Sequence, residues 1–338
     1  MEKMRNFKAD ASGYHGRSHG KPDALVLLPV TNSVVSRFLR AEPVGSPALR
    51  HTGAGRRTLA FLPEPAVFRP PAVAALPKSF CRTAPPTAAP IATEALDLPN
   101  GLEFHFPAPM RGAAKFLIRE IFHRGRYHRP GFEIRLDDTV IDIGANMGLF
   151  SLWAAPQARH GRVIAVEPTA AIDALEHNAQ LNLLSHVTPV KAAIGRDGEM
   201  IELEHYPGFN IVTHQQGWRP AAITRAAVRL LYGRPGVEPV RVAAPCISLG
   251  RLMDEHEIDA VNFLKVDCEG AEYGMFRDLA PRHWNRIERI AMEFHELHPG
   301  HRHAELVTML RDRGFQVAVR KPWLDYYCMK FGEIWAWR

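Results

Sequence analysis

A turn with two glycines is the first place in the chain whose residue types could support chemistry. Asp142, Gly144 and Gly148 lie in the run Asp-Ile-Gly-Ala-Asn-Met-Gly, directly after the β-branched segment Thr139–Ile143. Glycines at such a turn let a nucleoside approach the backbone without a Cβ in the way. The G-x-x-x-G spacing differs from the G-x-G-x-x-G of dinucleotide folds, and a carboxylate before it suits a cationic or hydroxyl-rich ligand better than a phosphate. The turn therefore favours a nucleoside cofactor that is not a dinucleotide.

A second carboxylate follows the next apolar segment. Glu167 comes directly after Val163–Val166, and Pro168 ends that segment. An acid about 20 residues after a glycine turn binds the ribose hydroxyls in nucleoside-binding α/β folds. A carboxylate at a strand end can also be merely solvated, but together with the glycine turn Glu167 indicates a ribose ligand.

Three further polar residues follow two later apolar segments. Asp267 and Glu269 come after Val261–Val266, and His295 comes after Arg289–Phe294. Ligands of open α/β sheets bind at the carboxyl ends of the strands. The two carboxylates could take a proton from a substrate hydroxyl or hold a divalent cation, although Glu269 could instead only favour a helix N-terminus. His295 is a candidate general base because imidazole titrates near neutrality, although a lone histidine is often structural.

The elements that must position these residues alternate regularly from Thr139 onward. This pattern predicts an α/β, doubly wound, mostly parallel seven-stranded sheet covered by helices on both faces. The expected strands are 139–143, 163–166, 187–192, 261–266 and 289–294, with a closing antiparallel pair at 315–320 and 333–337. The expected helices are 113–123, 149–158, 170–184, 248–256, 271–279 and 303–313, and 131–136 is expected to be a short extended segment.

Composition divides the 338-residue chain into a tail and a domain. Residues 1–95 hold 13 Lys/Arg, 6 Asp/Glu and many of the prolines, and they show no sustained period. We expect them to be a largely disordered extension, and we expect residues 96–338 to form one domain. An insert at about 206–240 interrupts the alternation, with a basic helix expected at Ala221–Tyr232 and strands at Ile201–His205 and Val240–Ala244.

Several classes of protein are disfavoured. The four cysteines form no CxxC pair, which argues against a zinc site or disulfides and favours a reducing, cytoplasmic location. No apolar run reaches the roughly 18 residues of a membrane span. The positive charge is confined to the N-terminal third, and no aromatic-basic interleaving suited to base stacking appears, so we do not expect a nucleic-acid partner.

From about Glu120 to Glu296 the chain resembles the FkbM-type methyltransferases. The resemblance lies in the order and combination of these motifs: Arg119-Glu120-Ile121-Phe122, Tyr127-x-x-Pro130-Gly131, Asp138–Gly148, Val166-Glu167-Pro168, Asn178-x-x-Leu181-Asn182, Leu264–Glu272 and Glu293-x-His295. It implies a class I, Rossmann-like methyltransferase sheet with S-adenosyl-L-methionine against the glycine turn, including Ala145 and Asn146. It also implies Glu167 on the ribose, Asp142 near the amino-acid end of the cofactor, and Asp267 and Glu269 beside the sulfonium and substrate.

The resemblance implies methyl transfer from a sulfonium to a hydroxyl of a sugar, glycan or natural product, in which the protein mainly supplies alignment. Asp267, Glu269 or His295 would take the hydroxyl proton, no metal is assigned, and Tyr127 is a candidate lid over the cofactor. The insert, without a counterpart in the family pattern, is a candidate substrate lid. Three alternatives remain open: a nucleic-acid methyltransferase that uses the basic tail, a non-catalytic nucleoside-binding scaffold, and a nicotinamide oxidoreductase. The last is disfavoured by the missing second glycine of the G-x-G turn.

Overall fold

The computed structural model describes residues 93–205, 214–215, 240–323, 326–327 and 330–338. Nearly all of the expected N-terminal extension and the expected basic helix Ala221–Tyr232 lie outside the described residues. The first described element is β1 (Thr93–Asp97).

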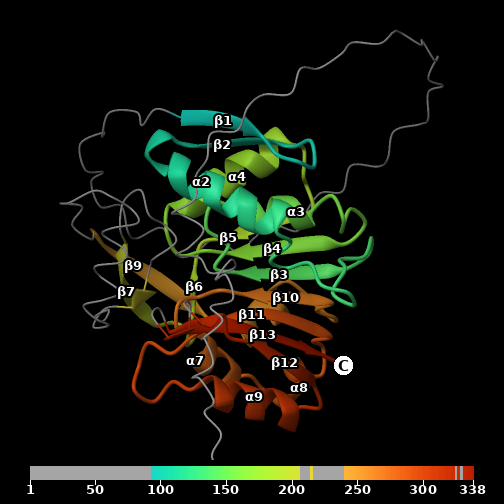
Figure 1. Cartoon of the computed structure of the whole chain (residues 1–338), viewed down its shortest axis with the longest axis vertical. Helices are drawn as coiled ribbons and strands as arrows, with labels where there is room; N and C mark the ends of the chain where they lie inside the picture. The colour runs from blue at the N-terminus through green and yellow to red at the C-terminus, as the bar shows by residue number, and fades with distance from the viewer. Residues whose placement is uncertain (1–92, 206–213, 216–239, 324–325, 328–329) are drawn as a thin grey trace, which may run out of the picture.

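A seven-stranded sheet with the order β12-β13-β11-β10-β3-β4-β5 forms the centre of the described structure (Figure 1). The strands from β3 to β11 in this sheet run parallel, whereas β13 is antiparallel to both β11 and β12. This confirms the doubly wound, mostly parallel sheet and the closing antiparallel pair. The strands are β3 (Thr139–Ile143), β4 (Arg162–Val166), β5 (Val187–Val190), β10 (Phe263–Val266), β11 (Arg289–His295), β12 (Gln316–Arg320) and β13 (Phe331–Trp337).

Both faces of this sheet are buried, because successive side chains of a strand point to opposite faces. Val140 belongs to a core shared with one set of helices, and its neighbour Ile141 belongs to a second core shared with another set. The first set is α2 (Arg111–Ile118), α3 (Leu149–Ala154) and α4 (Ala171–Leu181), and the second is α6 (Leu249–Glu255), α7 (Glu272–Arg277), α8 (Pro281–Trp284) and α9 (His303–Asp312). Figure 1 shows α2, α3 and α4 toward the top and α7, α8 and α9 toward the bottom.

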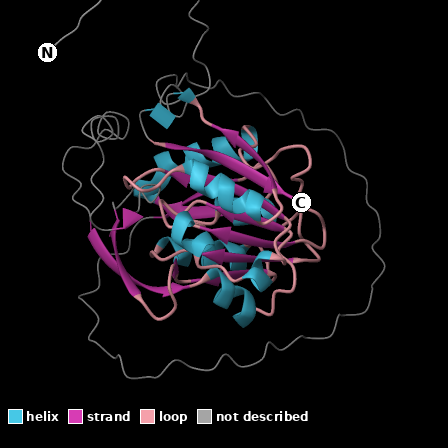
Figure 2. Ribbon diagram, turned by 90° about the horizontal axis from the view of Figure 1, so that it is seen from below, coloured by secondary structure: helices cyan, strands magenta, loops and turns pink. Residues whose placement is uncertain are grey.

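Two smaller sheets flank the main one. The predicted strands at Ile201 and Val240 are present as β7 (Met200–His205) and β9 (Val240–Ile247), which pair antiparallel. Together with β6 (Ala193–Ile194) and β8 (His214–Gln215) they make a four-stranded sheet that projects from one side (Figures 1 and 2). The hairpin of β1 and β2 (Glu103–Pro107), which the sequence did not reveal, lies on α4, where the Asn178 side chain accepts a hydrogen bond from the backbone of His105 (2.7 Å).

Two local expectations differ from the structure. The expected extended segment at 131–136 forms no strand; Phe132 and Ile134 are buried in the core, and the Glu133 carboxylate accepts a hydrogen bond from the backbone N–H of Gly131. The expected helix 113–123 continues beyond α2 as the π-helical turn η2 (Arg119–His123), and the short 3-10 turn η1 (Ala108–Met110) precedes it. Neither difference changes the sheet.

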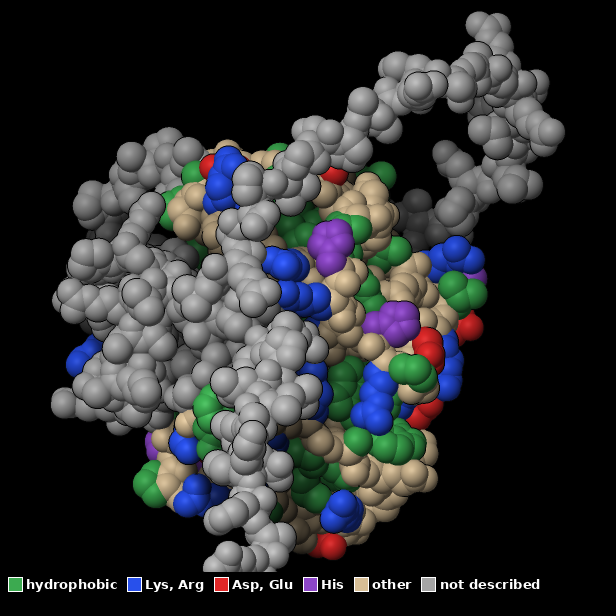
Figure 3. Space-filling model, viewed as in Figure 1, with side chains coloured by type: hydrophobic (Ala, Val, Ile, Leu, Met, Phe, Trp, Pro, Cys, Tyr) green, Lys and Arg blue, Asp and Glu red, His purple; other side chains and the backbone are tan. Residues whose placement is uncertain are grey.

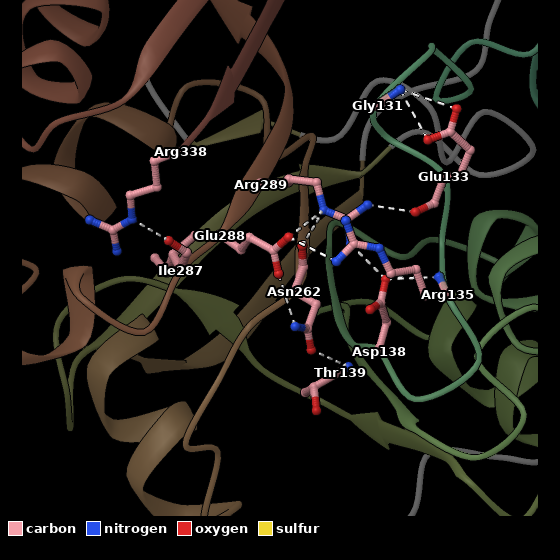
Figure 4. A network of polar contacts seen from close by, with 10 residues as sticks. All are labelled: Gly131, Glu133, Arg135, Asp138, Thr139, Asn262, Ile287, Glu288, Arg289 and Arg338. Carbon is pink, nitrogen blue, oxygen red and sulfur yellow. Dashed lines mark hydrogen bonds and ion pairs between the residues drawn. The ribbon is translucent and has the colours of Figure 1, made fainter.

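A group of polar side chains at the amino ends of the strands links neighbouring strands of the main sheet. We call Asp138, Asn262, Glu288 and Arg289 the amino-edge cluster (Figure 4). Arg289, at the start of β11, donates to the Asp138 carboxylate (2.7 Å) and to the backbone carbonyl of Asn262 (3.0 Å). Because the Asn262 side chain in turn donates to Glu288 (3.1 Å) and accepts from the backbone of Thr139 (2.9 Å), the cluster ties β11, β10 and β3 together.

Candidate active site

A cavity of about 960 Å³ lies at the opposite, carboxyl ends of the strands. Its lining includes residues that follow β3, β4, β10 and β11, which is where ligands of open α/β sheets bind. Of the sequence-predicted residues, these line the cavity: Tyr127, Gly144, Ala145, Asn146, Glu167, Pro168, Asp267, Glu269 and His295. Asp142 and Gly148 are not among the lining residues.

The glycine turn passes so close to its neighbours that side chains would not fit. Gly144 has φ +74°, and a Cβ there would lie 1.8 Å from the carbonyl oxygen of Asp267. Gly148 has φ +87°, and a Cβ there would lie 2.2 Å from Leu175 of α4. Gly144 therefore brings the turn against the end of β10, whereas Gly148 packs the start of α3 against α4 instead of meeting a ligand.

Glu167 is held in a defined orientation at the end of β4. One carboxylate oxygen accepts hydrogen bonds from the backbone N–H and hydroxyl of Thr169 (3.0 and 2.7 Å), and the other accepts from the backbone N–H of Asn146 (3.0 Å). Burial raises the pKa of Glu167, while the hydrogen bonds from Thr169 and Asn146 oppose that shift. The carboxylate thus joins the glycine turn to β4, and it faces the cavity with two fixed oxygens.

Asp142 stabilises the glycine turn through buried contacts. It is fully buried, accepts a hydrogen bond from Ser151 (2.7 Å) and forms an ion pair with Lys265 (2.9 Å). Lys265 also donates to the carbonyl oxygens of Gly144 (2.8 Å) and Ile143 (3.2 Å). Burial alone would lower the pKa of Lys265, but Asp142 and Asp267 outweigh it and raise that pKa. The ion pair therefore fixes the glycine turn. This role for Lys265 was not predicted from the sequence, in which its only signal was a charged residue within the apolar run Phe-Leu-Lys-Val.

Asp267, Glu269, Glu272, Glu293 and His295 gather at the ends of β10 and β11, and we call them the carboxyl-edge cluster. Glu272 is fully buried, and it accepts a hydrogen bond from the backbone N–H of His295 (2.6 Å), with the ring Nδ1 3.3 Å from the same oxygen. The ring Nε2 lies 3.5 Å from Glu269 and 3.7 Å from Glu293. The histidine is thus tied at one ring nitrogen and faces two further carboxylates with the other.

The carboxylates determine the charge of the histidine. Burial alone would lower the pKa of His295, but Glu269, Glu272 and Glu293 raise it well above its usual value. The ring is therefore an imidazolium at neutral pH, which already carries the proton that a general base would have to accept. This argues against the expected role of His295 as the base.

The two acids after β10 differ from each other. Burial raises the pKa of Glu269 to about 8, with His295 opposing the shift. Burial and then Glu293 raise the pKa of Asp267, which makes its carboxylate a stronger base than one in water. Among the described residues, none donates a hydrogen bond to the Asp267 side chain or forms an ion pair with it.

Two walls of the cavity come from the segment before β3. Tyr127 is buried, its ring meets Phe150 edge-on at 5.0 Å between centroids, and Lys265 lies 5.9 Å from the ring centre. This packing places Tyr127 in the wall of the cavity, and its expected role as a lid over the cofactor stays a prediction. Arg126 also lines the cavity and binds Glu293 (2.5 Å), a contact that sequence reasoning missed because the two residues lie far apart in the chain.

Donor atoms of Asp267, Glu293 and His295 lie within 4.8 Å of one another, as the ligands of a metal ion could. The protonated ring and the guanidinium of Arg126 already place positive charge among these carboxylates. An imidazolium is not a metal ligand, because the ring nitrogen must be free of its proton. The cluster is therefore better suited to internal ion pairing than to a metal ion.

Comparison with known proteins connects this site to one family. Residues 142–317 match the model of the methyltransferase FkbM domain. The 31-O-demethyl-FK506 methyltransferase FkbM of Streptomyces tacrolimicus is 29% identical over 245 residues, which is 68% of this chain and 91% of that protein. Methyltransferase 1 of Beauveria bassiana is 26% identical over 227 residues, covering 62% and 83% of the two chains. The structure of M. jannaschii TYW2 in complex with AdoMet aligns with a TM-score of 0.38 and 13% identity over 74% of this chain and 86% of that one. The chain belongs to the FkbM methyltransferase family.

Proposed function

We propose that this protein transfers the methyl group of S-adenosylmethionine to a hydroxyl of a small-molecule or glycan acceptor. One observation carries the proposal: a single cavity is lined both by the fixed Glu167 carboxylate with the glycine turn and by four members of the carboxyl-edge cluster, Asp267, Glu269, Glu293 and His295. The first group suits a nucleoside, and the second suits a hydroxyl that must lose its proton.

The residues present fit the cofactor. The two oriented oxygens of Glu167 would accept hydrogen bonds from the ribose hydroxyls, and the backbone at Gly144, Ala145 and Asn146 would pass along the nucleoside. Pro168 and Tyr127 would form walls, whereas Asp142 would act only through Lys265. When bound, S-adenosylmethionine supplies the electrophilic methyl group, and the protein provides its alignment.

Asp267 is the residue best placed to take the acceptor proton. Its carboxylate would accept the hydroxyl proton as the acceptor oxygen takes the methyl group that bound S-adenosylmethionine would supply. The Nε2–H of His295 would donate a hydrogen bond to the acceptor oxygen, because its nearest carboxylates lie 3.5 and 3.7 Å away.

The acceptor class rests on the charge of the site and on the relatives. The name of one relative states a methyl transfer to 31-O-demethyl-FK506, which is a natural product, and a glycan hydroxyl would present the same chemistry. A nucleic-acid acceptor is less favoured, because the sequence shows no aromatic-basic interleaving suited to base stacking. On the face seen in Figure 3, basic and acidic side chains both occur among the described residues. Among the described residues, no helix is long and apolar enough to cross a membrane. We propose a cytoplasmic location on the cysteine pattern alone.

Calorimetric titration of the full chain tests the proposal. S-adenosylmethionine and S-adenosylhomocysteine should bind at micromolar concentrations, and NADH should not. Glu167→Gln should weaken both at least tenfold, because it replaces an acceptor of two hydroxyl hydrogen bonds, whereas Glu176→Gln on the exposed side of α4 should change nothing. If well-folded protein bound neither ligand, or bound NADH better, the proposal would be wrong.

A further inference from the structure

Two acids face each other directly across the antiparallel pair of β11 and β13. Glu293 and Glu333 are register partners, and their side chains are only 12% and 9% exposed. Like charges directly opposite each other on neighbouring strands repel, and burial strengthens the repulsion. A cation is therefore needed at this point for both carboxylates to remain ionised.

Arg126, from the segment before β3, is that cation. Its guanidinium donates to Glu293 at 2.5 Å, and it lies 3.8 Å from Glu333 and 3.5 Å from Glu120. The other two acids have arginines of their own.

Glu333 is bound by Arg320 at 2.7 and 2.5 Å, and Glu120 is bound by Arg124 at 2.5 Å. The closest contact of Arg126 is thus with Glu293, the acid that belongs to the carboxyl-edge cluster.

The two oxygens of Glu293 have different partners. Oε2 is bound by Arg126, and Oε1 lies 3.7 Å from the Nε2 of His295. Burial would raise the pKa of Glu293, but Arg126 and then His295 lower it below its usual value. Arg126 thereby keeps a negative charge in place directly beside the imidazolium.

We propose that Arg126 is a positioning residue of the acceptor site, which acts through Glu293 to keep His295 charged and its Nε2–H directed at the cavity. The inference rests on the proposed function, because it assigns a task to the ring that donates to the acceptor oxygen. Arg126 need not touch the cofactor or the acceptor for this role.

The two ways in which Arg126 could act on His295 predict opposite changes in the pKa of the ring when Arg126 is removed. The ring faces Glu269 after β10, Glu272 of α7 and Glu293 of β11, and beyond them lie Asp267, Lys265, Glu333 and Arg126. If Arg126 acted on the ring only as a distant positive charge, its removal would raise the pKa of His295. If it acts through Glu293, its removal lets Glu293 bind a proton, and the pKa of His295 falls.

The experiment is nitrogen NMR of histidine-labelled full-length protein, with the His295 ring assigned by its loss in His295→Asn. Arg126→Gln should lower the pH at which the ring loses its proton by at least one unit, a tenfold change in proton affinity. Glu293→Gln should lower it too, and the double variant should add little to either single change, as expected for residues that act as one unit. Arg124→Gln, from the same turn, is the matched control and should leave the ring unchanged.

Arg126→Lys keeps a charge near Glu293 and should leave the His295 pKa close to its wild-type value. If Arg126→Gln does not fold, Glu293→Gln provides the test. A His295 pKa that rises or stays constant in folded Arg126→Gln, or in Glu293→Gln where only that variant folds, would overturn the inference. So would a tenfold loss of S-adenosylhomocysteine affinity in Arg126→Lys, since Arg126 would then be a cofactor ligand. Failure of the proposed function would appear separately, as wild-type protein that binds no S-adenosylhomocysteine.

Discussion

Strand β11 carries a buried charged residue at each end, and the two ends are built differently. Arg289 starts the strand in the amino-edge cluster, where its guanidinium donates to a carboxylate and to two backbone carbonyls. His295 ends the strand in the carboxyl-edge cluster, where Glu269, Glu272 and Glu293 face one ring beside a large cavity. The first cluster matches donors to acceptors inside the protein. The second leaves Asp267 without a donor among the described residues, and a site that must accept a proton requires such a group.

The largest expected effect is on turnover at the carboxyl edge. Asp267→Asn keeps the shape of the side chain but cannot accept the hydroxyl proton, so the turnover number should fall about 10²–10⁴-fold. Affinity for S-adenosylhomocysteine, measured by calorimetry, should change less than threefold. Asp259→Asn, an exposed residue before β10, is the control. Full turnover in Asp267→Asn would show that alignment alone accounts for catalysis.

At the amino edge the expected effect is on stability. Arg289→Met leaves the carboxylate of Asp138, which is 3% exposed, without its cation, and it should cost about 3–5 kcal/mol in the free energy of unfolding. Arg135→Ala removes an exposed partner of Glu288 and should cost less than about 1 kcal/mol. Urea unfolding measures both. Equal losses in the two variants would mean that burial of the ion pair is not what matters.

The carboxyl edge should also make stability depend on pH. The pKa of Glu269 is raised to about 8, so its contribution is fully present below the usual carboxyl pKa and is lost as the pH rises toward 8. The raised pKa of His295 acts in the same direction. Urea unfolding of Glu269→Gln between pH 5 and 8 should show a slope flatter by up to about 1.4 kcal/mol per pH unit, the value for one proton. An unchanged slope would mean that a group other than Glu269 causes the pH dependence of the free energy of unfolding.

Removal of metal ions should have the smallest effect. Because Arg126 and the charged ring already pair with the carboxylates near Asp267, dialysis against EDTA should leave cofactor affinity and turnover within twofold. Loss of turnover that Mg²⁺ or Mn²⁺ restores would reverse this assignment and make the three donor atoms within 4.8 Å a metal site.

Much of this arrangement could be predicted because local pattern and sheet topology agree. Alternating apolar segments identified the strands of the main sheet, and acids directly after them had to meet at one edge, since parallel strands end on the same side. The hairpin of β1 and β2 was missed because its stability comes from contacts with α4, about 75 residues away, such as that between His105 and Asn178. Asp142 was expected near the cofactor because it precedes the glycine turn; in the structure it pairs with the buried Lys265 and is not among the residues that line the cavity.

The sequence by itself therefore determined the doubly wound sheet, the place of the glycine turn, and the set of acids at the carboxyl edge, because these follow from residue order along each strand. Only the tertiary structure decided which groups carry protons. The raised pKa values of His295, Glu269 and Asp267 depend on burial and on carboxylates brought together from separate strands. Electrostatic energy depends on distances in space and on exclusion of water, and neither can be read from separation along the chain.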